Sequence, residues 1–314
     1  MVEYELSKSE LKLKDTSLMR KIWLCAALSL FFTACEPKHD VAKYKPTLSE
    51  ETQKVYIVGI HPYLNSQKTY LSYRPILNYL EAHMPSVKFK IETSEDYAHY
   101  NEKLRQQVFD FSLPNPYQTV TSFQYGYNVI AKMKPDSEFR GILVARKDKH
   151  IRTISRLKNN KISFPAPTAL AAAMMPLYYL HKEGLDTHKD IQKLYVGSQF
   201  SSIMNAYSGD TMAGATWPTS WKDWCVQNPD KVNDMEVIWE TPTLVNNGFV
   251  AHERVPLGLA QYVAVLLSSL DENPDGMKLL QDAGFDGFEM ASNFTFERVV
   301  DFLKQYEQTI GLPK

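Results

Sequence analysis

The sequence predicts an α/β protein of two lobes joined by two connecting segments. Short β-branched or apolar runs alternate with amphipathic stretches along most of the chain, which is the pattern of strand–helix units. Two segments interrupt this alternation. Residues 146–151 are charged, and residues 241–247 follow the strand expected over 236–239. We interpret these segments as crossings, so that residues 55–145 plus 243–314 form lobe 1 and residues 146–242 form lobe 2, each with a mixed sheet.

Lobe 1 is expected to begin with a strand over residues 55–60, whose nearly continuous apolar residues are typical of a central parallel strand. A helical stripe follows over 69–83 and contains Pro75. Two prolines flank Asn115 and mark a helix start, because proline is well tolerated in the first helical turn. The same criteria predict strands over 87–91, 109–113, 127–133 and 139–145 and a polar helix over 97–107.

The stretch 161–217 makes up most of lobe 2 and reads as strand, loop, helix, strand, loop, helix, strand. Small and polar residues gather where each strand meets its helix, at the sheet edge where ligands bind in open α/β folds. Free N–H groups at helix N-termini favour anions and carbonyl-type acceptors there. We therefore expect one wall of a small-molecule cleft. A helix over 218–227, a strand over 236–239 and lobe 1 helices over 256–270, 273–283 and 296–310 complete the chain.

Composition and charge are those of a packed globular protein, with 44% hydrophobic and 23% charged residues. The formal net charge is -1 and no basic run is long enough to follow a phosphate backbone, so nucleic acid is not an expected partner. The three cysteines form no CxxC pair and the eight histidines show no HExxH spacing. We expect no metal, no other cofactor and no disulfide framework.

Residues 19–35 have the pattern of a secretion signal. Arg20 and Lys21 precede an apolar run over 22–32 that is too short to span a bilayer as a stable helix. The ending FTAC resembles a bacterial lipobox, in which the cysteine, here Cys35, is acylated and becomes the first residue of the mature protein. The alternative is an N-terminal anchor helix that is never cleaved.

The residues before Met19 are polar and charged, which predicts that translation begins at Met19 and that residues 1–35 are leader and signal. Residues 36–54 contain two prolines and many charges without apolar periodicity, as is typical of a tether. This arrangement predicts a protein anchored by lipid at Cys35 in the bacterial periplasm or at the cell surface. Cys225 is then a lone thiol that acts as a small hydrophobic residue.

Several ordered features between residues 54 and 310 resemble the solute-binding proteins of phosphate, phosphite and phosphonate ABC transporters. They are VGIHPYLN followed by YRPILNYLE, the turn DFSLPNPYQ, the block ISFPAPTALAAAMMP and the block GSQFSSIMNAYSGDTMAGATW. The resemblance implies a two-lobed type 2 periplasmic binding fold with a two-segment hinge. It also implies capture of a small solute between the lobes and its delivery to a membrane permease.

The chain departs from the family pattern where the family holds oxyanions. Phe164 and Pro167 keep the spacing, but Ala166 stands at an aspartate position, and Ala-Leu-Ala-Ala at 169–172 replaces Ser-Thr-Ser-Gly. Gln199 replaces the histidine of Gly-Ser-His. Three hydroxyls for phosphonate oxygens are missing, and each charge-assisted bond contributes about 1.5–3 kcal/mol. The resemblance therefore supports solute binding. A phosphonate- or phosphate-like solute is one alternative, and the missing hydroxyls argue against it.

The candidate ligand contacts follow strands on both sides of the cleft. Thr168 either caps the alanine-rich helix or donates to a ligand. Ala169 either allows close backbone approach or only tight packing, and Trp217 either stacks on a solute or packs in the core. Asn246 and Asn247 are expected to supply turn geometry near the hinge. The candidates are His61, Tyr63, Asn115, Tyr117 and Gln118 from lobe 1, and Thr168, Ala169, Ser198, Gln199, Ser201, Thr216 and Trp217 from lobe 2.

Two other functions would use the same cleft. A lipid-anchored receptor would present its solute to a membrane kinase or chemoreceptor instead of a permease. An enzyme would need an activated nucleophile or clustered metal ligands. The sequence has no GxSxG motif, no His/Cys pairing near Cys225 and no paired carboxylates at the strand ends. We therefore expect a binding protein rather than an enzyme.

Overall fold

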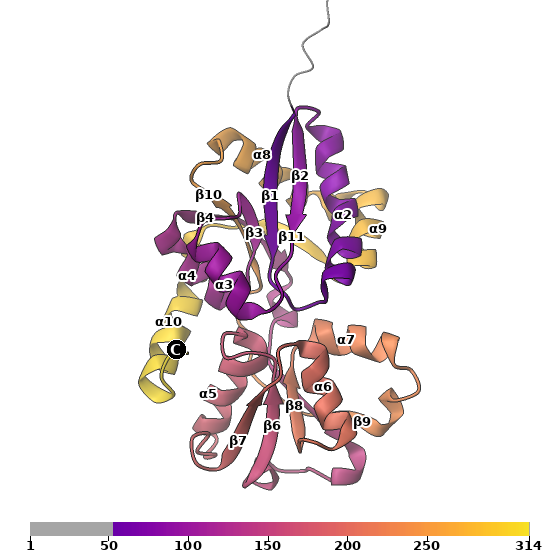
Figure 1. Ribbon diagram of the computed structural model, residues 1–314, viewed down its shortest axis with the longest axis vertical. Coiled ribbons are helices and arrows are strands. Elements are labelled where there is room, and N and C mark those ends of the chain that lie inside the picture. Colours follow the sequence, from indigo (N-terminus) through magenta and orange to yellow (C-terminus); the bar gives the residue numbers. More distant parts are fainter. Residues whose placement is uncertain (1–52, 314) are drawn as a thin grey trace, which may run out of the picture. The chain divides into compact units, whose positions relative to one another are not determined.

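The computed structural model describes residues 53–313 (Figure 1). The predicted start at Met19, the signal, the lipid-bearing Cys35 and nearly all of the tether lie outside these residues. Within the described part, no helix combines the length and the apolar character needed to cross a membrane. The strands of this part form two sheets with helices packed on them.

The first sheet is mixed, and its strands come from both ends of the described chain. β1 (Lys54–Ile60) pairs in parallel with β2 (Val87–Glu92) and β3 (Phe111–Leu113). β10 (Gly248–His252) is antiparallel to β3 and to β4 (Tyr127–Lys134), and β11 (Gly287–Met290) is antiparallel to β4. The spatial order is β11-β4-β10-β3-β1-β2. The parallel centre agrees with the continuous apolar run of β1.

The second sheet is also mixed and uses only the middle of the chain. β6 (Asn160–Phe164) pairs in parallel with β7 (Ile191–Tyr195) and β8 (Ala213–Thr216). β5 (Ile142–Arg146) is antiparallel to β8 and to β9 (Met235–Glu240), which gives the order β7-β6-β8-β5-β9. Two mixed sheets in an α/β protein confirm the predicted fold class.

The first crossing between the sheets precedes β5, contrary to the prediction. The strand expected over 139–145 was assigned to lobe 1, but β5 pairs with β8 and β9 of the second sheet. The connection from β4 therefore spans residues 135–141. The charged residues 146–151, interpreted as the crossing, hold a short surface turn at Lys147–Lys149. The charged residues indicate a solvent-exposed turn and not a crossing. The sheet to which β5 belongs depends on its pairing with β8 and β9.

The helices fall close to their predicted ranges. Those that pack with the first sheet are α2 (Ser66–His83), α3 (Tyr97–Arg105), α4 (Pro116–Ser122), α8 (Leu257–Ser268), α9 (Pro274–Ala283) and α10 (Glu297–Thr309), and those of the second are α5 (Met175–Lys182), α6 (Gln199–Ser208) and α7 (Pro218–Gln227). α2 begins before its predicted start because the Asn65 side chain accepts from the Lys68 N–H at 2.8 Å. Pro75 lies inside this helix without ending it.

Two strands of the first sheet were not predicted. Every residue of β10 is buried, and β10 lies between β3 and β4. Its sequence, GFVAH, directly follows Asn246 and Asn247, which were interpreted only as turn residues. β11 is a four-residue strand at the sheet edge. Neither strand is long enough to show an alternation of apolar and polar residues. Their strand conformation therefore depends on pairing with neighbouring strands of the sheet.

Two connectors join the sheets and run beside each other. Residues 135–141 lead from β4 to β5, and residues 241–247 lead from β9 to β10. The Leu244 N–H donates to the Phe139 carbonyl at 3.0 Å. Asn246 bonds to the first connector through both its main chain and its side chain, each at 3.0 Å. This pairing is the two-segment connection of the predicted fold.

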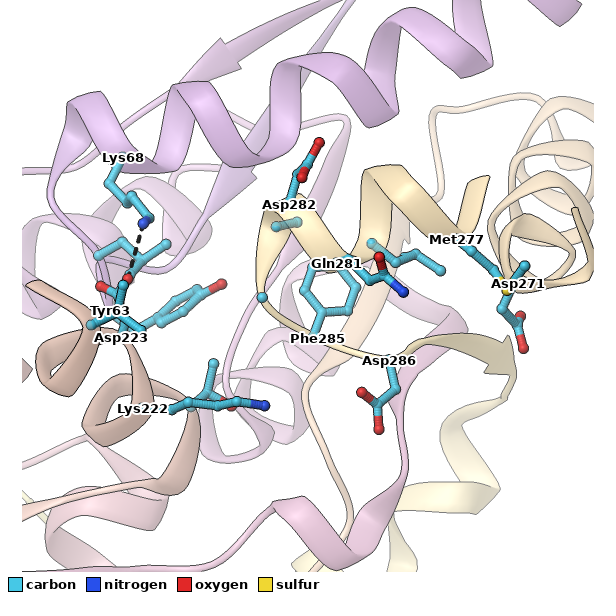
Figure 2. Close-up of a pocket in the computed structure, with 16 residues that line it drawn as sticks. Tyr63, Lys68, Lys222, Asp223, Asp271, Met277, Gln281, Asp282, Phe285 and Asp286 are labelled. Carbon is cyan, nitrogen blue, oxygen red and sulfur yellow. Dashed lines mark ion pairs between the residues drawn. The ribbon is translucent and has the colours of Figure 1, made fainter. Parts of the chain in front are cut away.

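Side chains link the two sheets beyond the connectors. Lys68 of α2 forms an ion pair with Asp223 of α7, with Nζ and Oδ1 2.9 Å apart (Figure 2). α10 packs against α4 of the first sheet, and its Phe302 ring contacts Tyr178 and the neighbouring tyrosine of α5. The Tyr178 hydroxyl also donates to Gln305 at 2.9 Å. The C-terminal helix therefore contacts elements of both sheets.

Candidate functional site

The two loops that were predicted to form the site meet at one small cavity. Its volume is about 10 Å³, and its lining includes the predicted residues His61, Asn115, Ala169, Gln199 and Trp217. His61 directly follows β1, Asn115 precedes α4, Ala169 lies in the alanine-rich turn, Gln199 begins α6 and Trp217 directly follows β8. A cavity of this size holds about one water molecule. The site is therefore assembled, but its polar groups are largely in contact with each other.

Two hydrogen bonds join loops of different sheets at this cavity, and a third holds one of the side chains involved. The Asn115 amide donates to the Thr168 carbonyl at 3.0 Å, and the Gln199 amide donates to the Tyr97 hydroxyl at 3.1 Å. The other end of the Gln199 side chain accepts from the Thr216 hydroxyl at 2.8 Å. All of these residues except Tyr97 were expected to contact a solute. In this arrangement they satisfy one another.

His61 is buried, and its imidazole is neutral at pH 7. Its Nδ1–H donates to the Leu113 carbonyl at 2.8 Å, which leaves Nε2 as the acceptor. Burial lowers the pKa of His61 to about 4, although the bond to Leu113 acts in the opposite direction. The imidazole therefore offers an acceptor and no positive charge. A ligand that bonds to Nε2 must bring its own donor.

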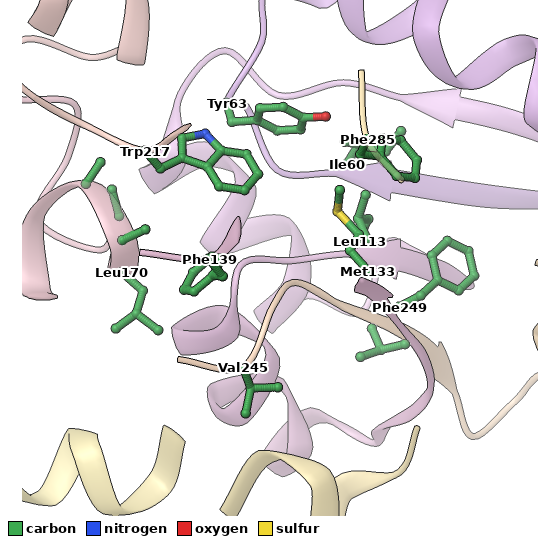
Figure 3. Packing of buried hydrophobic residues seen from close by; sticks show 14 of the residues in the cluster. Ile60, Tyr63, Leu113, Met133, Phe139, Leu170, Trp217, Val245, Phe249 and Phe285 are labelled. Atoms are coloured by element: carbon green, nitrogen blue, oxygen red, sulfur yellow. The ribbon is translucent and has the colours of Figure 1, made fainter. Parts of the chain in front are cut away.

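The Tyr63 and Trp217 rings contact each other edge to face, with centroids 5.5 Å apart and planes at 81° (Figure 3). Both are buried. The Trp217 indole donates to the Ser220 hydroxyl at 2.6 Å, and the Tyr63 hydroxyl bonds to Tyr73 at 2.7 Å. Burial raises the pKa of Tyr63 well above its ordinary value. Both side chains are used in packing, which is the alternative the sequence left open for Trp217.

The alanine-rich turn packs tightly against the first connector. It begins with a π-helical turn at Leu170–Met174, all of it buried, and continues as α5. A Cβ on Gly141 of the connector would lie 2.3 Å from the Ala171 carbonyl oxygen. Glycine is therefore required at position 141 for this approach. The run itself is buried, and both roles considered for it, packing and close approach to a ligand, stay predictions.

Thr168 is not the cap of this helix, contrary to one of the two roles considered for it. Ala169 occupies the cap position, and no side chain accepts there. The Thr168 hydroxyl accepts from Asn101 at 3.4 Å, and its carbonyl accepts from Asn115. A π-helical start shifts the first helical residue, so the usual hydroxyl-to-N3 geometry does not form.

The other predicted residues begin helices or pack near the site. Asn115 and Gln118 form a capping box for α4, with both bonds at 3.1 Å. Ser198 caps α6 by accepting from the Ser201 N–H at 3.0 Å, and its hydroxyl donates to that of Ser201. Tyr117 is half-buried against the hydrophobic core. Sequence reasoning placed these residues correctly at strand–helix junctions, and their roles as ligand contacts stay predictions.

Three lining residues were missed by sequence reasoning. Tyr97 begins α3, Phe139 lies in the first connector, and Asn247 precedes β10. Asn247 is fully buried, and its Oδ1 has no hydrogen-bond partner among the described residues. Tyr97 carried a usable signal because it follows β2 in the same way that Asn115 follows β3. Asn247 carried none, since its position depends on the unpredicted strand β10.

Two larger cavities adjoin the Lys68–Asp223 ion pair, and both of these residues line each of them. The first has a volume of about 540 Å³ and is lined on one side by Phe285 and Asp286 (Figure 2). The second has a volume of about 460 Å³ and reaches Gln199 at the start of α6. Among residues 53–313, no group of three or more His, Cys, Asp or Glu side chains is placed to hold a metal ion.

Comparison of the sequence with known proteins finds relatives among the substrate-binding proteins of ABC transporters. A family model described as "ABC transporter, phosphonate, periplasmic substrate-binding protein" matches residues 58–296. Over 166 residues the chain is 26% identical to the probable ABC transporter phosphite binding protein PhnD1 of Prochlorococcus marinus strain MIT 9301. That match covers 49% of this chain and 56% of the relative, so the chain spans little more than half the relative's length.

Solved structures share the fold at low sequence identity. The binding protein component PA3383 of an ABC phosphonate transporter from Pseudomonas aeruginosa has a TM-score of 0.74 and 16% identity, over 82% of this chain and 88% of that one. PhnD1 of Prochlorococcus marinus with methylphosphonate has a TM-score of 0.72 and 21% identity, over 82% and 99%. XAC2383 of Xanthomonas citri bound to ATP has a TM-score of 0.66 and 15% identity, over 83% and 99%.

Proposed function

Because the chain belongs to the family of periplasmic substrate-binding proteins of phosphonate ABC transporters, we propose that it captures a small solute between its lobes and delivers it to an ABC permease. The observation that carries this proposal is the bond from the Gln199 amide to the Tyr97 hydroxyl at 3.1 Å. It joins a loop of the second sheet to a helix of the first across the predicted cleft. A receptor that closes on its ligand requires polar groups on both lips in these positions.

The proposed mechanism is closure about the paired connectors at residues 135–141 and 241–247. Only these two segments join the sheets through the main chain in the described part. Small main-chain rotations there separate or join the lips. On opening, the Asn115 and Gln199 amides exchange their partners on the other lobe for water. A bound solute would replace those partners on closing.

The solute is proposed to be a small polar molecule that is not held as the family's oxyanion motif implies. PhnD1 of Prochlorococcus marinus has been solved with methylphosphonate. Here the corresponding turn offers methyl groups at Ala169 and Ala171 and an isobutyl group at Leu170. The cavity of about 10 Å³ beside it has no room for a phosphonate. The cavity has this size while the lips are bonded to each other, so it widens on opening, and the head group of the solute needs donors other than the hydroxyls that the turn lacks.

The proposed location is the periplasm or the cell surface, with a lipid anchor at Cys35 followed by a tether over residues 36–54. Support comes from the signal pattern of residues 19–35 and the charged, proline-containing residues 36–54. Radiolabelled palmitate should be incorporated into the wild-type protein and not into Cys35→Ser. Equal labelling of both would rule out acylation at this cysteine.

Solute capture is tested on protein purified from its own host. Native mass spectrometry should detect a retained small molecule, and small-angle X-ray scattering should show a larger radius of gyration after that molecule is removed. A protein that retains nothing, shows no thermal shift across a broad solute panel and keeps one radius of gyration throughout would contradict the proposed function.

A further inference from the structure

The small cavity between the lobes contains a hydrogen-bond acceptor that no group in the described part of the chain satisfies. His61 lines the cavity and is 3% exposed. A carbonyl can only accept, so the bond to Leu113 keeps the proton on Nδ1 and leaves a lone pair on Nε2. Nε2 makes no bond to the described residues, and it is not one of the unpaired atoms without accessible surface. This nitrogen can therefore accept a hydrogen bond from a solute.

The side-chain amides on the two lips present their nitrogens to the opposite lobe. The Asn115 oxygen accepts from the Gln118 N–H at 3.1 Å, and the Gln199 oxygen accepts from the Thr216 hydroxyl at 2.8 Å. Both of these bonds stay within one lobe, whereas the two amide nitrogens donate to the other lobe. Opening of the cleft therefore frees the nitrogens and leaves the oxygens paired. The open cleft then offers two amide donors and the imidazole acceptor of His61.

None of the described side chains that line this cavity carries a charge at pH 7. His61 is neutral because burial lowers its pKa to about 4. The other lining residues have amide, phenol, aromatic or aliphatic side chains, and Phe139, Leu170 and Trp217 are among them (Figure 3). A charged group enclosed here would find no side chain of opposite charge, which makes its burial costly. The lone pair on Nε2 would also repel an anionic oxygen. The lining therefore favours an uncharged solute.

We propose that the cleft binds an uncharged solute of the lactam or imide class, whose ring N–H donates to Nε2 of His61 and whose carbonyl oxygen accepts from the Asn115 and Gln199 amides. Such a ring carries an N–H directly beside a carbonyl, so it supplies both the donor and the acceptor that the open cleft lacks. Its flat body suits the aromatic and aliphatic part of the lining. The inference rests on the proposed solute-binding function and specifies its ligand class.

The first test titrates the full-length wild-type chain with uracil, an uncharged cyclic imide, by isothermal titration calorimetry. Two analogues are matched to it. 1,3-Dimethyluracil keeps both carbonyls and lacks the N–H groups, and orotate is the same ring with one carboxylate added. Each analogue should bind at least about tenfold more weakly than uracil, because the first cannot donate to His61 and the second brings a charge that the lining does not neutralise.

The second test observes the accepting nitrogen itself by NMR of protein labelled with ¹⁵N-histidine. The chain has eight histidines, and the His61→Gln variant identifies the His61 signals. On saturation with uracil, the Nε2 signal should move upfield, as an imidazole nitrogen does when it accepts a hydrogen bond. The signals of the exposed His83 should stay in place. This measurement needs only the wild-type protein in its bound and free states.

A variant and a matched control test the role of His61 in selecting the solute. His61→Phe keeps a ring at this position and lacks the acceptor. Its Kd for uracil should rise about 10-fold or more, and its preference for uracil over 1,3-dimethyluracil should disappear. His252→Phe is the control, because His252 is also buried but does not line the cavity. Its Kd should equal that of the wild type, and circular dichroism should show that both variants fold.

The outcomes separate this inference from the proposed function. If uracil binds while the Nε2 signal of His61 stays in place, solute binding stands and the role of His61 is wrong. If uracil does not bind, or if orotate binds as tightly as uracil, the assignment to an uncharged lactam or imide is wrong. The mass-spectrometric search for a retained solute then decides the proposed function independently, and a retained anion would support capture while contradicting this ligand class.

Discussion

The side-chain amide of Asn115 donates a hydrogen bond to the main-chain carbonyl of Thr168 at 3.0 Å. The two residues belong to loops of different sheets, and the bond closes one edge of the small cavity. The same Asn115 side chain caps α4 through its oxygen. One residue therefore starts a helix and also connects the lobes, and its two functions can be separated by substitution.

Asn115→Ser should keep the cap and lose the contact between lobes. A serine oxygen caps a helix nearly as well as asparagine, but its short side chain does not reach Thr168. We expect the unfolding free energy to fall by about 1 kcal/mol and the unliganded protein to become more open by small-angle X-ray scattering. Asn273→Ser is the control, because Asn273 caps α9 and makes no bond to the other sheet. Equal scattering curves for Asn115→Ser and wild type would contradict the role in closure.

His61 should make the protein less stable as the pH falls from about 6.5 to 4. Burial lowers its pKa to about 4 in the folded state, so the unfolded chain takes up the proton first. The neutral imidazole makes its full contribution to the free energy of unfolding above pH 6.5. This contribution is lost progressively as the pH falls toward 4, by up to about 3 kcal/mol. Urea unfolding of wild type and His61→Gln at pH 7, 5.5 and 4 should show a smaller loss in the variant.

The exposed His83 offers the control for this experiment. His83→Gln should retain the full wild-type pH dependence of the unfolding free energy. If His61→Gln also retains it, the imidazole of His61 titrates alike in the folded and unfolded states, and its burial has no consequence for stability in acid.

Gly141→Ala should be strongly destabilising. The new Cβ would lie 2.3 Å from the Ala171 carbonyl oxygen and 2.8 Å from the Pro176 ring. Overpacking of this kind costs about 1–3 kcal/mol. Gly258→Ala is the matched control, since a Cβ at this position of α8 meets nothing within 4 Å. Alanine is favoured over glycine in helices, so the urea midpoint of Gly258→Ala should be equal or higher. Equal midpoints for the two variants would show that the connector does not need its close approach to the alanine-rich turn.

The Lys68–Asp223 ion pair should contribute little to stability although it links the two sheets. Its side chains are 39% and 24% exposed, and such pairs typically contribute less than about 1 kcal/mol. A double-mutant cycle with Lys68→Met and Asp223→Asn should give a coupling free energy in this range at low salt. The coupling should decrease further in 1 M NaCl because the pair is screened. A coupling of several kcal/mol that is insensitive to salt would show that the pair is effectively buried.

The candidate site was predictable where a residue's role is local. Asn115, Ser198 and Gln199 follow strands and begin helices, and the structure brings Asn115 and Gln199 to one cavity. Asn247 was assigned only to turn geometry, and Trp224 and Ser94 were not selected at all. Each of these three residues lines a cavity and also has a buried polar atom without a hydrogen-bond partner among the described residues. An unpaired polar atom cannot be recognised from sequence, because it is unpaired only if no residue that is near it in space offers a hydrogen-bond partner.

The sequence alone determined the alternation of strands and helices and the helix starts at capping residues such as Asn115 and Ser198. These features depend on contacts within a few residues, and their signals are therefore present in any short window. Tertiary structure decided the sheet to which β5 belongs, the existence of β10, and the filling of the cleft by Tyr63 and Trp217. Strand partners and ring contacts join residues far apart in the chain, so their free energy exists only after the sheets have formed.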